Sequence, residues 1–245
     1  MSKTAGERRV GLAVETSGCV GSVALGRGEE ILEAKELSDG RRHAVELLPV
    51  VQMLCRRHNV RPGEVAEVYV SGGPGSFTGL RIGITFAKTL ALGGGTRVVR
   101  VPTLDVIAQN VLALDPPPAY LAVVLDAKRG RVYAAAFELV EAGGPGYRLI
   151  MQPAEVAPAD FLARMPPGSA VVGEGTAYHR EAVEHSGLVI LPAPYSQALA
   201  EMVYRLGRRQ AAAGCFDDPN ALTPIYIRRP EAEEVYERRH GEPTT

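Results

Sequence analysis

Short apolar runs separated by turn residues dominate the first part of the chain. The run Val10–Val14 is typical of a buried strand, and the turn residues Glu-Thr-Ser-Gly follow it. A second strand is predicted at Ser22–Leu25, because Gly26 and Gly28 then give a hairpin signal. The segment EILEAKELS, residues 30–38, alternates loosely and is the expected third strand. The pattern therefore predicts a meander of three strands.

Helical spacing begins after this meander. Asp39 is a candidate N-cap for a first helix, and Pro49 within that helix predicts a kink or a late start. Apolar side chains and one histidine fall at helical intervals, namely His43, Leu47, Leu48, Val51 and Leu54. Further along, the pattern predicts a fourth strand at 64–73, a long helix from about Ser76 to Leu92 that three glycines end, and a fifth strand at 96–102.

This order of elements then recurs. A meander followed by helix, strand, helix and strand is the order of a ribonuclease-H-like unit, and DPPPA at 115–119 is a plausible joint. A second meander is predicted at 119–150, a short helix at 159–165, a strand at 169–175 and a C-terminal helix at 196–214. We therefore expect an α/β fold of two ribonuclease-H-like halves. The expected domains are 1–115 and 116–245, with the last segment packing back on the first half.

Composition narrows the class of protein. Apolar residues make up 46% of the chain and charged residues 22%, which is ordinary for a globular protein. The net charge of -1 gives no overall basic field for nucleic acid. No secretory signal and no run of eighteen apolar residues is present, so we expect a cytoplasmic protein without a membrane span. Cys19, Cys55 and Cys215 lie far apart and match no zinc spacing.

The densest motif is SGGPGSFTGLRIGITFAK, residues 71–88, between the fourth strand and the long helix. A Walker loop is excluded, because no glycine pair has its spacing and no lysine follows one. Gly73, Gly75 and Gly79 give a loose variant of the dinucleotide fingerprint. No acidic residue ends the next strand, which weakens this interpretation.

The helix itself suggests a third interpretation. Small residues recur every four positions, at Gly79, Gly83, Ala87 and Ala91. Each helical glycine costs about 1 kcal/mol relative to alanine, so another backbone must approach closely. One alternative is packing of Gly79 and Gly83 against the protein's own first helix. The other is a second protein that meets the outward residues, which are Thr78, Arg81, Ile82, Thr85 and Phe86.

Sequence blocks along the whole chain resemble one family. GGPGSFTGLRIGITFAK closely resembles the signature of the TsaB family, also called YeaZ, of the bacterial tRNA threonylcarbamoyladenosine pathway. Five further segments resemble other parts of that family: LAVETSGCVGSVAL, HAVELLPVVQMLC, DAKRGRVYAAAF, VVGEGTAYHR and PIYIRRPEAEE. The resemblance implies a fold of the actin/Hsp70/sugar-kinase (ASKHA) type, in agreement with the order of elements.

Residues for catalysis are hard to find. The family relative TsaD uses two metal-binding histidines one helical turn apart, whereas no two of His43, His58, His179, His185 and His240 are three or four residues apart. Glu15 and Asp126 follow the first strands of the two halves, where kinases and ATPases of this fold handle Mg²⁺ through water. The loop after Glu15 lacks a lysine or a glycine run for phosphates. We therefore expect no catalytic, cofactor-binding or metal-binding residue.

The resemblance implies a role for the chain. It would be a non-catalytic partner of the TsaD threonylcarbamoyltransferase, required for N6-threonylcarbamoyladenosine at position 37 of tRNAs that read codons beginning with A. The TsaE ATPase would join the complex, tRNA would be met indirectly, and the chain alone would form a homodimer. Two alternatives are a nucleotide-dependent enzyme of the same fold, such as a small kinase or ATPase, and a glycoprotease-like peptidase. The expected partner interface comprises His43, Leu47, Val51, Phe77, Thr78, Gly79, Arg81, Ile82, Gly83, Thr85 and Phe86.

Overall fold

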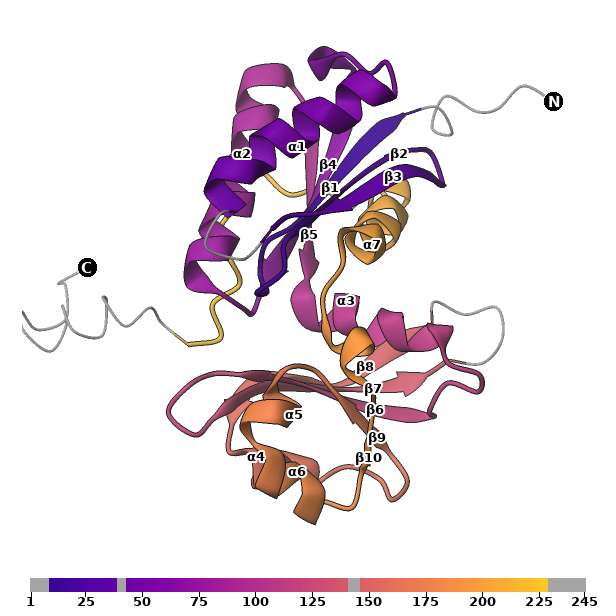
Figure 1. Ribbon diagram of the computed structural model, residues 1–245, viewed down its shortest axis with the longest axis vertical. Helices are drawn as coiled ribbons and strands as arrows, with labels where there is room; N and C mark the ends of the chain where they lie inside the picture. The colour runs from indigo at the N-terminus through magenta and orange to yellow at the C-terminus, as the bar shows by residue number, and fades with distance from the viewer. Residues whose placement is uncertain (1–8, 39–42, 141–145, 229–245) are drawn as a thin grey trace, which may run out of the picture.

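Two five-stranded sheets, one in each half of the chain, form the framework of the protein (Figure 1). The computed structural model describes residues 9–38, 43–140 and 146–228. The first sheet has the order β3-β2-β1-β4-β5 and the second the order β10-β9-β6-β7-β8. The strands of the first sheet are β1 Val10–Glu15, β2 Ser22–Arg27, β3 Glu30–Glu36, β4 Val65–Gly73 and β5 Arg97–Pro102. Those of the second are β6 Tyr120–Asp126, β7 Val132–Leu139, β8 Tyr147–Val156, β9 Ala170–Val172 and β10 Val189–Ile190.

The two sheets have the same topology. In each half the first three strands pair antiparallel, and the fourth and fifth strands run parallel to the first. Counted within its own half, each sheet therefore reads 3-2-1-4-5. This order confirms the two ribonuclease-H-like halves and the fold class expected for an ASKHA-type protein. It differs from the all-parallel order 3-2-1-4-5-6 that a dinucleotide-binding fold requires.

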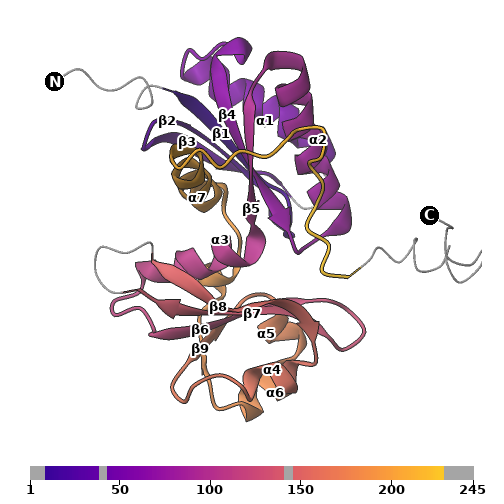
Figure 2. The same ribbon diagram turned by 180° about the vertical axis from the view of Figure 1, so that it is seen from behind.

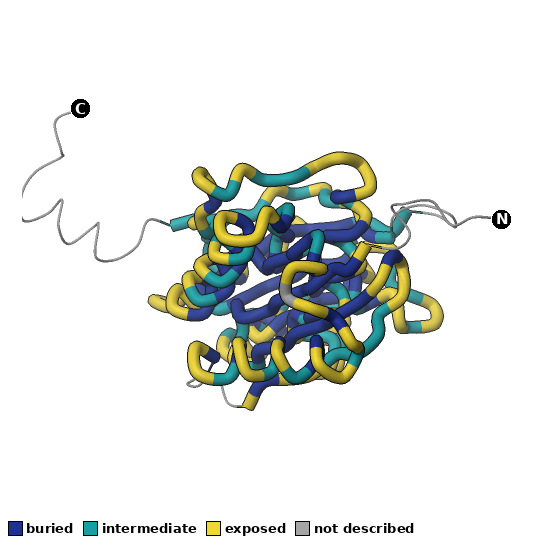
Figure 3. Tube along the Cα trace, turned by 90° about the horizontal axis from the view of Figure 1, so that it is seen from above, coloured by how far each residue is buried: buried dark blue, intermediate teal, exposed yellow. Residues whose placement is uncertain are grey.

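Helices cover both faces of the first sheet. Successive side chains of a strand point to opposite faces, and apolar side chains on both faces need to be covered. Helices α1 (His43–Arg57) and α2 (Phe77–Gly94) lie on one face, and α7 (Ala200–Ala212) lies on the other (Figure 1). Leu12 and Val14 belong to the apolar cluster beneath α1, whereas Ala13 between them belongs to the cluster with Val203 of α7. The strands β1, β2 and β4 are therefore buried from both sides, and Figure 3 shows buried strands in dark blue inside the yellow outer turns.

The last part of the described chain returns to the first sheet. Helix α7 packs on β1, β2, β4 and β5, and residues 217–228 then cross β5 and run along α2 (Figure 2). Helix α3 (Thr103–Asn110), which was not predicted, lies between the sheets and contacts α7, β5, β6 and β8. The domain boundary between residues 115 and 116 stays a prediction.

Apart from α7, the second half carries shorter helices than the first. These are α4 Pro158–Leu162, α5 Gly175–Tyr178 and α6 Arg180–His185. Short 3₁₀ turns occur in the first half at η3 Pro62–Glu64 and η4 Val111–Ala113, and in the second half at η5 Ala193–Ser196. The sequence indicated α4 but neither α5 nor α6. Within the described ranges, no helix is both long and apolar enough to cross a membrane.

Candidate functional site

Local signals define the long helix α2. Ser76 is its N-cap, and the Ser76 hydroxyl accepts a hydrogen bond from the Gly79 amide at 3.2 Å. Gly95 ends the helix in the left-handed conformation with φ 71°, and its amide donates to the Ala91 carbonyl at 2.9 Å. The helix therefore begins where the sequence predicted and ends two residues beyond the predicted end.

The glycine stripe of α2 faces the end of strand β1. A Cβ at Gly79 would overlap the Thr16 carbonyl oxygen, and a Cβ at Gly83 would lie 2.6 Å from Thr16 Oγ1. The Thr16 hydroxyl also donates a hydrogen bond of 2.8 Å to the Gly79 carbonyl. The predicted packing of these glycines against the first helix is therefore wrong, because α2 turns its small residues toward the sheet rather than toward α1.

Helix α1 meets α2 along a different face. Ile82, Phe86 and Leu90 of α2 pack against the apolar cluster that contains Leu47 and Val51 of α1. Above this contact lies an open groove of about 660 Å³ between the two helices. Its lining residues are Ala44, Leu47, Leu48, Phe77, Thr78, Arg81, Ile82, Thr85, Phe86, Thr89 and Leu90.

The predicted interface residues divide between this groove and the interior. Seven of the expected eleven line the groove: Leu47, Phe77, Thr78, Arg81, Ile82, Thr85 and Phe86. The other four, His43, Val51, Gly79 and Gly83, are buried and do not line it. His43 packs against Gly21, where an added Cβ would lie 2.8 Å from its Nε2. Two exposed apolar residues of α1 were not among the predicted interface residues. They are Val45, which is 73% exposed, and Leu48, which is 52% exposed.

One end of the groove contains a cluster from two distant parts of the chain. The ring of Tyr226 lies 5.7 Å from that of Phe77, and the guanidinium of Arg81 lies 4.0 Å above the Phe77 ring. Arg81 Nε donates to the Tyr226 hydroxyl at 3.4 Å. The C-terminal segment is fixed beside α2, since the Ile225 amide donates to the Gly72 carbonyl at 2.7 Å. Sequence analysis missed Tyr226, although it lies within the PIYIRRPEAEE block.

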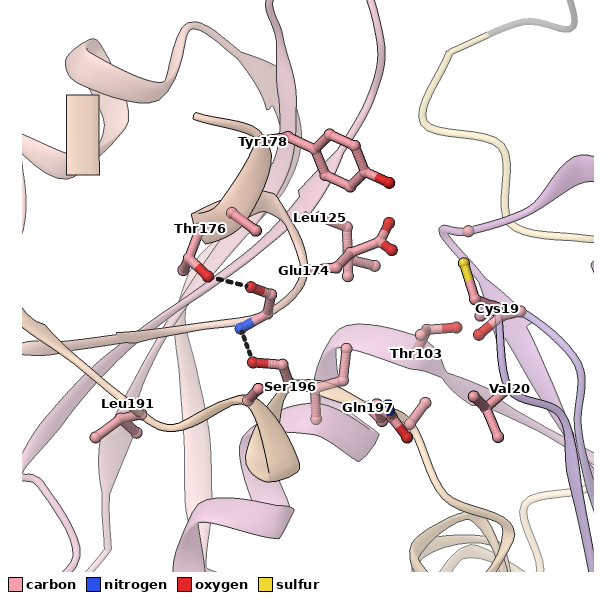
Figure 4. Close-up of a pocket in the computed structure, with 18 of the residues that line it drawn as sticks. Cys19, Val20, Thr103, Leu125, Glu174, Thr176, Tyr178, Leu191, Ser196 and Gln197 are labelled. Carbon is pink, nitrogen blue, oxygen red and sulfur yellow. Dashed lines mark hydrogen bonds between the residues drawn. The ribbon is translucent and has the colours of Figure 1, made fainter. Parts of the chain in front are cut away.

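A second concave region lies between the two halves. This cleft of about 510 Å³ has Ser17, Cys19 and Val20 on one side and Glu174, Thr176 and Tyr178 on the other (Figure 4). The Gly173 amide donates to Ser196 Oγ at 3.1 Å, and the Thr176 hydroxyl donates to the Gly173 carbonyl at 2.8 Å, so the second wall is held together by its own contacts.

The two acidic residues expected near the cleft are engaged within the protein. Glu15 is fully buried, and both the amide and the hydroxyl of Ser17 donate to its Oε1. Burial raises the pKa of Glu15 despite these hydrogen bonds, which disfavours the ionised form that a cation requires.

Asp126 has the opposite environment. Burial alone would raise its pKa, but Lys128 Nζ at 2.7 Å and His179 Nε2 at 3.2 Å outweigh burial and hold the pKa of Asp126 below its ordinary value. Its carboxylate is therefore ionised and paired with side chains of the protein itself. Across residues 9–38, 43–140 and 146–228, no three His, Cys, Asp or Glu side chains gather where a metal ion would bind.

Comparison with known proteins adds information on family. Residues 30–216 match the family model described as TsaD, tRNA N6-adenosine threonylcarbamoyltransferase. The chain is 28% identical to the tRNA threonylcarbamoyladenosine biosynthesis protein TsaB of Bacillus subtilis, over 91% of this chain and 95% of that protein. It is 29% identical to the Escherichia coli protein of the same name, over 89% and 94% of the two chains.

Solved structures agree with the sequence matches. YeaZ from Pseudomonas aeruginosa superimposes with a TM-score of 0.75 and 27% identity, over 89% of this chain and 99% of that chain. A second structure, of an uncharacterized protein with similarity to peptidase YEAZ from the same organism, gives a TM-score of 0.75 and 28% identity over 90% and 100%. The similarity therefore extends over both halves of the fold.

Proposed function

The chain belongs to the family that the TsaD model describes and, within it, to the TsaB/YeaZ proteins, and from this premise we propose that it acts in the biosynthesis of N6-threonylcarbamoyladenosine in tRNA. The relatives that carry this role in their names align with this chain over nearly their full length. This chain therefore has nearly the full length of the TsaB fold that such a role requires.

Within this pathway the chain is a non-catalytic partner of the TsaD transferase. The observation that supports this proposal best is the groove between α1 and α2, where Leu48 and Phe77 remain exposed. Contiguous apolar surface on a folded protein is typical of an interaction site, and aromatic residues and arginine are common among the residues that dominate binding. The groove offers both in one place.

The acidic residues near the cleft between the two halves also support a non-catalytic role. Phosphoryl chemistry in this fold needs ionised acids that are free to hold Mg²⁺ through water. Burial favours the protonated form of Glu15, and Asp126 is paired with Lys128 and His179. The runner-up function, a small kinase or ATPase, is favoured only by the volume of the cleft.

Further partners follow from the same surface. When TsaD is absent, a second copy of the chain covers the groove, so homodimer and TsaD complex exclude one another. The TsaE ATPase joins the assembled complex, and tRNA is contacted mainly through the other subunits. The net charge of -1 agrees with a subunit that contributes little to tRNA binding. The site of action is the cytoplasm.

Co-purification with TsaD of the same organism, followed by tRNA modification with and without this chain, tests the proposal. We expect a stable complex and modification that depends on the chain. Modification at full rate by TsaD and TsaE alone would contradict the proposal. ATP turnover by the purified chain with Mg²⁺, lost in Asp126→Asn, would instead support the enzymatic alternative.

A further inference from the structure

Arg81 is the charged residue on an otherwise uncharged groove. Among the described residues that line the groove, Arg81 is the one with a formal charge, and Leu48, Ile82 and Phe86 on the same groove are apolar. Its guanidinium forms no salt bridge with a carboxylate of the described chain, whereas the exposed Arg57, Arg61 and Arg180 each pair with a glutamate. The groove therefore presents a positive charge that this chain does not compensate within its described residues.

The position of this guanidinium is fixed rather than free. Its central carbon lies 4.0 Å from the centre of the Phe77 ring, and its Nε donates to the Tyr226 hydroxyl at 3.4 Å. These two contacts involve the Phe77 ring and Arg81 Nε. The two terminal amino groups of Arg81 form no hydrogen bond with described residues. An arginine held in this manner loses little conformational entropy when it binds a second partner.

The C-terminal segment determines where Tyr226 lies. Ile225, the residue before it, donates from its amide to Gly72 at 2.7 Å, and Arg228 Nη1, two residues after it, lies 3.3 Å from Glu155 Oε1 in the second half. Tyr226 is thus anchored on both sides along the chain. Its hydroxyl is a fixed acceptor for Arg81 at the end of the groove.

We propose that the protein partner in the α1–α2 groove presents an aspartate or glutamate carboxylate to Arg81, and that Tyr226 positions Arg81 to receive it. This inference rests on the proposed function, because the partner is the transferase subunit of that proposal. A planar guanidinium with two free amino groups matches a carboxylate in a bidentate pair. The surrounding apolar residues exclude water from this pair and so make it stronger than an exposed ion pair.

Affinity for TsaD, measured with the full chain by biolayer interferometry, tests the carboxylate. Arg81→Ala should weaken binding by about tenfold or more, as expected for a truncated interface arginine. Arg164→Ala, an exposed arginine of the second half, is the matched control and should bind as the unaltered chain does. The association rate of the unaltered chain should fall with added salt more steeply than that of Arg81→Ala.

A double-mutant cycle tests the role of Tyr226. Tyr226→Phe keeps the ring on Phe77 and removes the hydroxyl that Arg81 contacts. We expect weaker TsaD binding from Tyr226→Phe when Arg81 is present and no further effect when Arg81 is already alanine. Equal effects in both backgrounds would show that Tyr226 acts on folding or packing and would overturn its positioning role.

The outcomes separate this inference from the function on which it rests. If the unaltered chain binds TsaD and Arg81→Ala binds within twofold of it, the carboxylate proposal is wrong while the function stands. If the unaltered chain does not bind TsaD, both fail. Rescue of Arg81→Glu by a single acidic-to-arginine change in TsaD would identify the partner carboxylate.

Discussion

The Thr16 side chain binds the backbone of Gly79 with a hydrogen bond of 2.8 Å, while the Thr16 carbonyl occupies the place that a Cβ of Gly79 would take. The close approach inferred from the glycine stripe is therefore real, but it joins a helix to a strand end. This contact fixes the start of α2, and with it the groove, on the end of β1.

Gly79→Ala should destabilise the protein. The new methyl group would meet the backbone oxygen of Thr16, which cannot move without shifting β1, and overpacking of this kind costs about 1–3 kcal/mol. Gly93→Ala is the matched control, because a Cβ there meets no atom within 4 Å and alanine favours the helix by up to about 1 kcal/mol. Urea unfolding should give opposite signs for the two variants. Equal stability of Gly79→Ala and the unaltered chain would contradict the close contact.

Local sequence signals predicted much of this architecture. The Ser76 cap and the glycines after Leu92 indicated the bounds of α2 to within two residues, and both meanders were expected. Helix α3 was missed because it has only eight residues, fewer than the window over which helical spacing becomes a clear signal.

Tertiary placement explains the remaining differences. Local spacing showed that the stripe of α2 needs a close neighbour but could not tell whether α1 or β1 supplies it. Tyr226 and Phe77 are far apart in the chain, and no local pattern reports their stacking. His43 and Val51 have helical spacing whether they face a partner or the core, and the structure buries them.

Glu15→Gln should change how stability depends on pH. Because burial raises the folded-state pKa of Glu15, the folded protein binds a proton that the unfolded chain has released, and stability falls as pH rises from about 4.3 through the folded pKa. Glutamine cannot ionise and can still accept from Ser17. The variant should therefore match the unaltered chain near pH 4 and exceed its stability at pH 8, as measured by thermal unfolding.

Glu33→Gln is the control with the opposite sign. Hydrogen bonds from His58 and Arg57 hold the pKa of Glu33 below its ordinary value, so its contribution is present above the unfolded pKa and is lost as pH falls through the folded one. This variant should be less stable than the unaltered chain at pH 8 and equal to it in acid. A Glu15→Gln protein with the same trend would show that Glu15 is ionised when folded.

The isolated chain should contain no catalytic metal and show no robust ATPase or peptidase activity. The reason is the pairing of Asp126 with Lys128 and His179 and the burial of Glu15. Metal analysis and a coupled ATPase assay on the purified chain are the measurements. Stoichiometric zinc or iron that disappears when two histidines are replaced would refute this prediction.

Ile82→Glu should abolish homodimer and TsaD binding while the monomer stays folded. Ile82 lines the groove, so a carboxylate there would lose its water when a partner covers the groove. Leu92→Glu is the matched control, because Leu92 is 61% exposed on the same helix but does not line the groove. Size-exclusion chromatography with circular dichroism should show a folded monomer for Ile82→Glu and an unchanged complex for Leu92→Glu. A folded Ile82→Glu protein that still forms both complexes at full affinity would place the interface on another face.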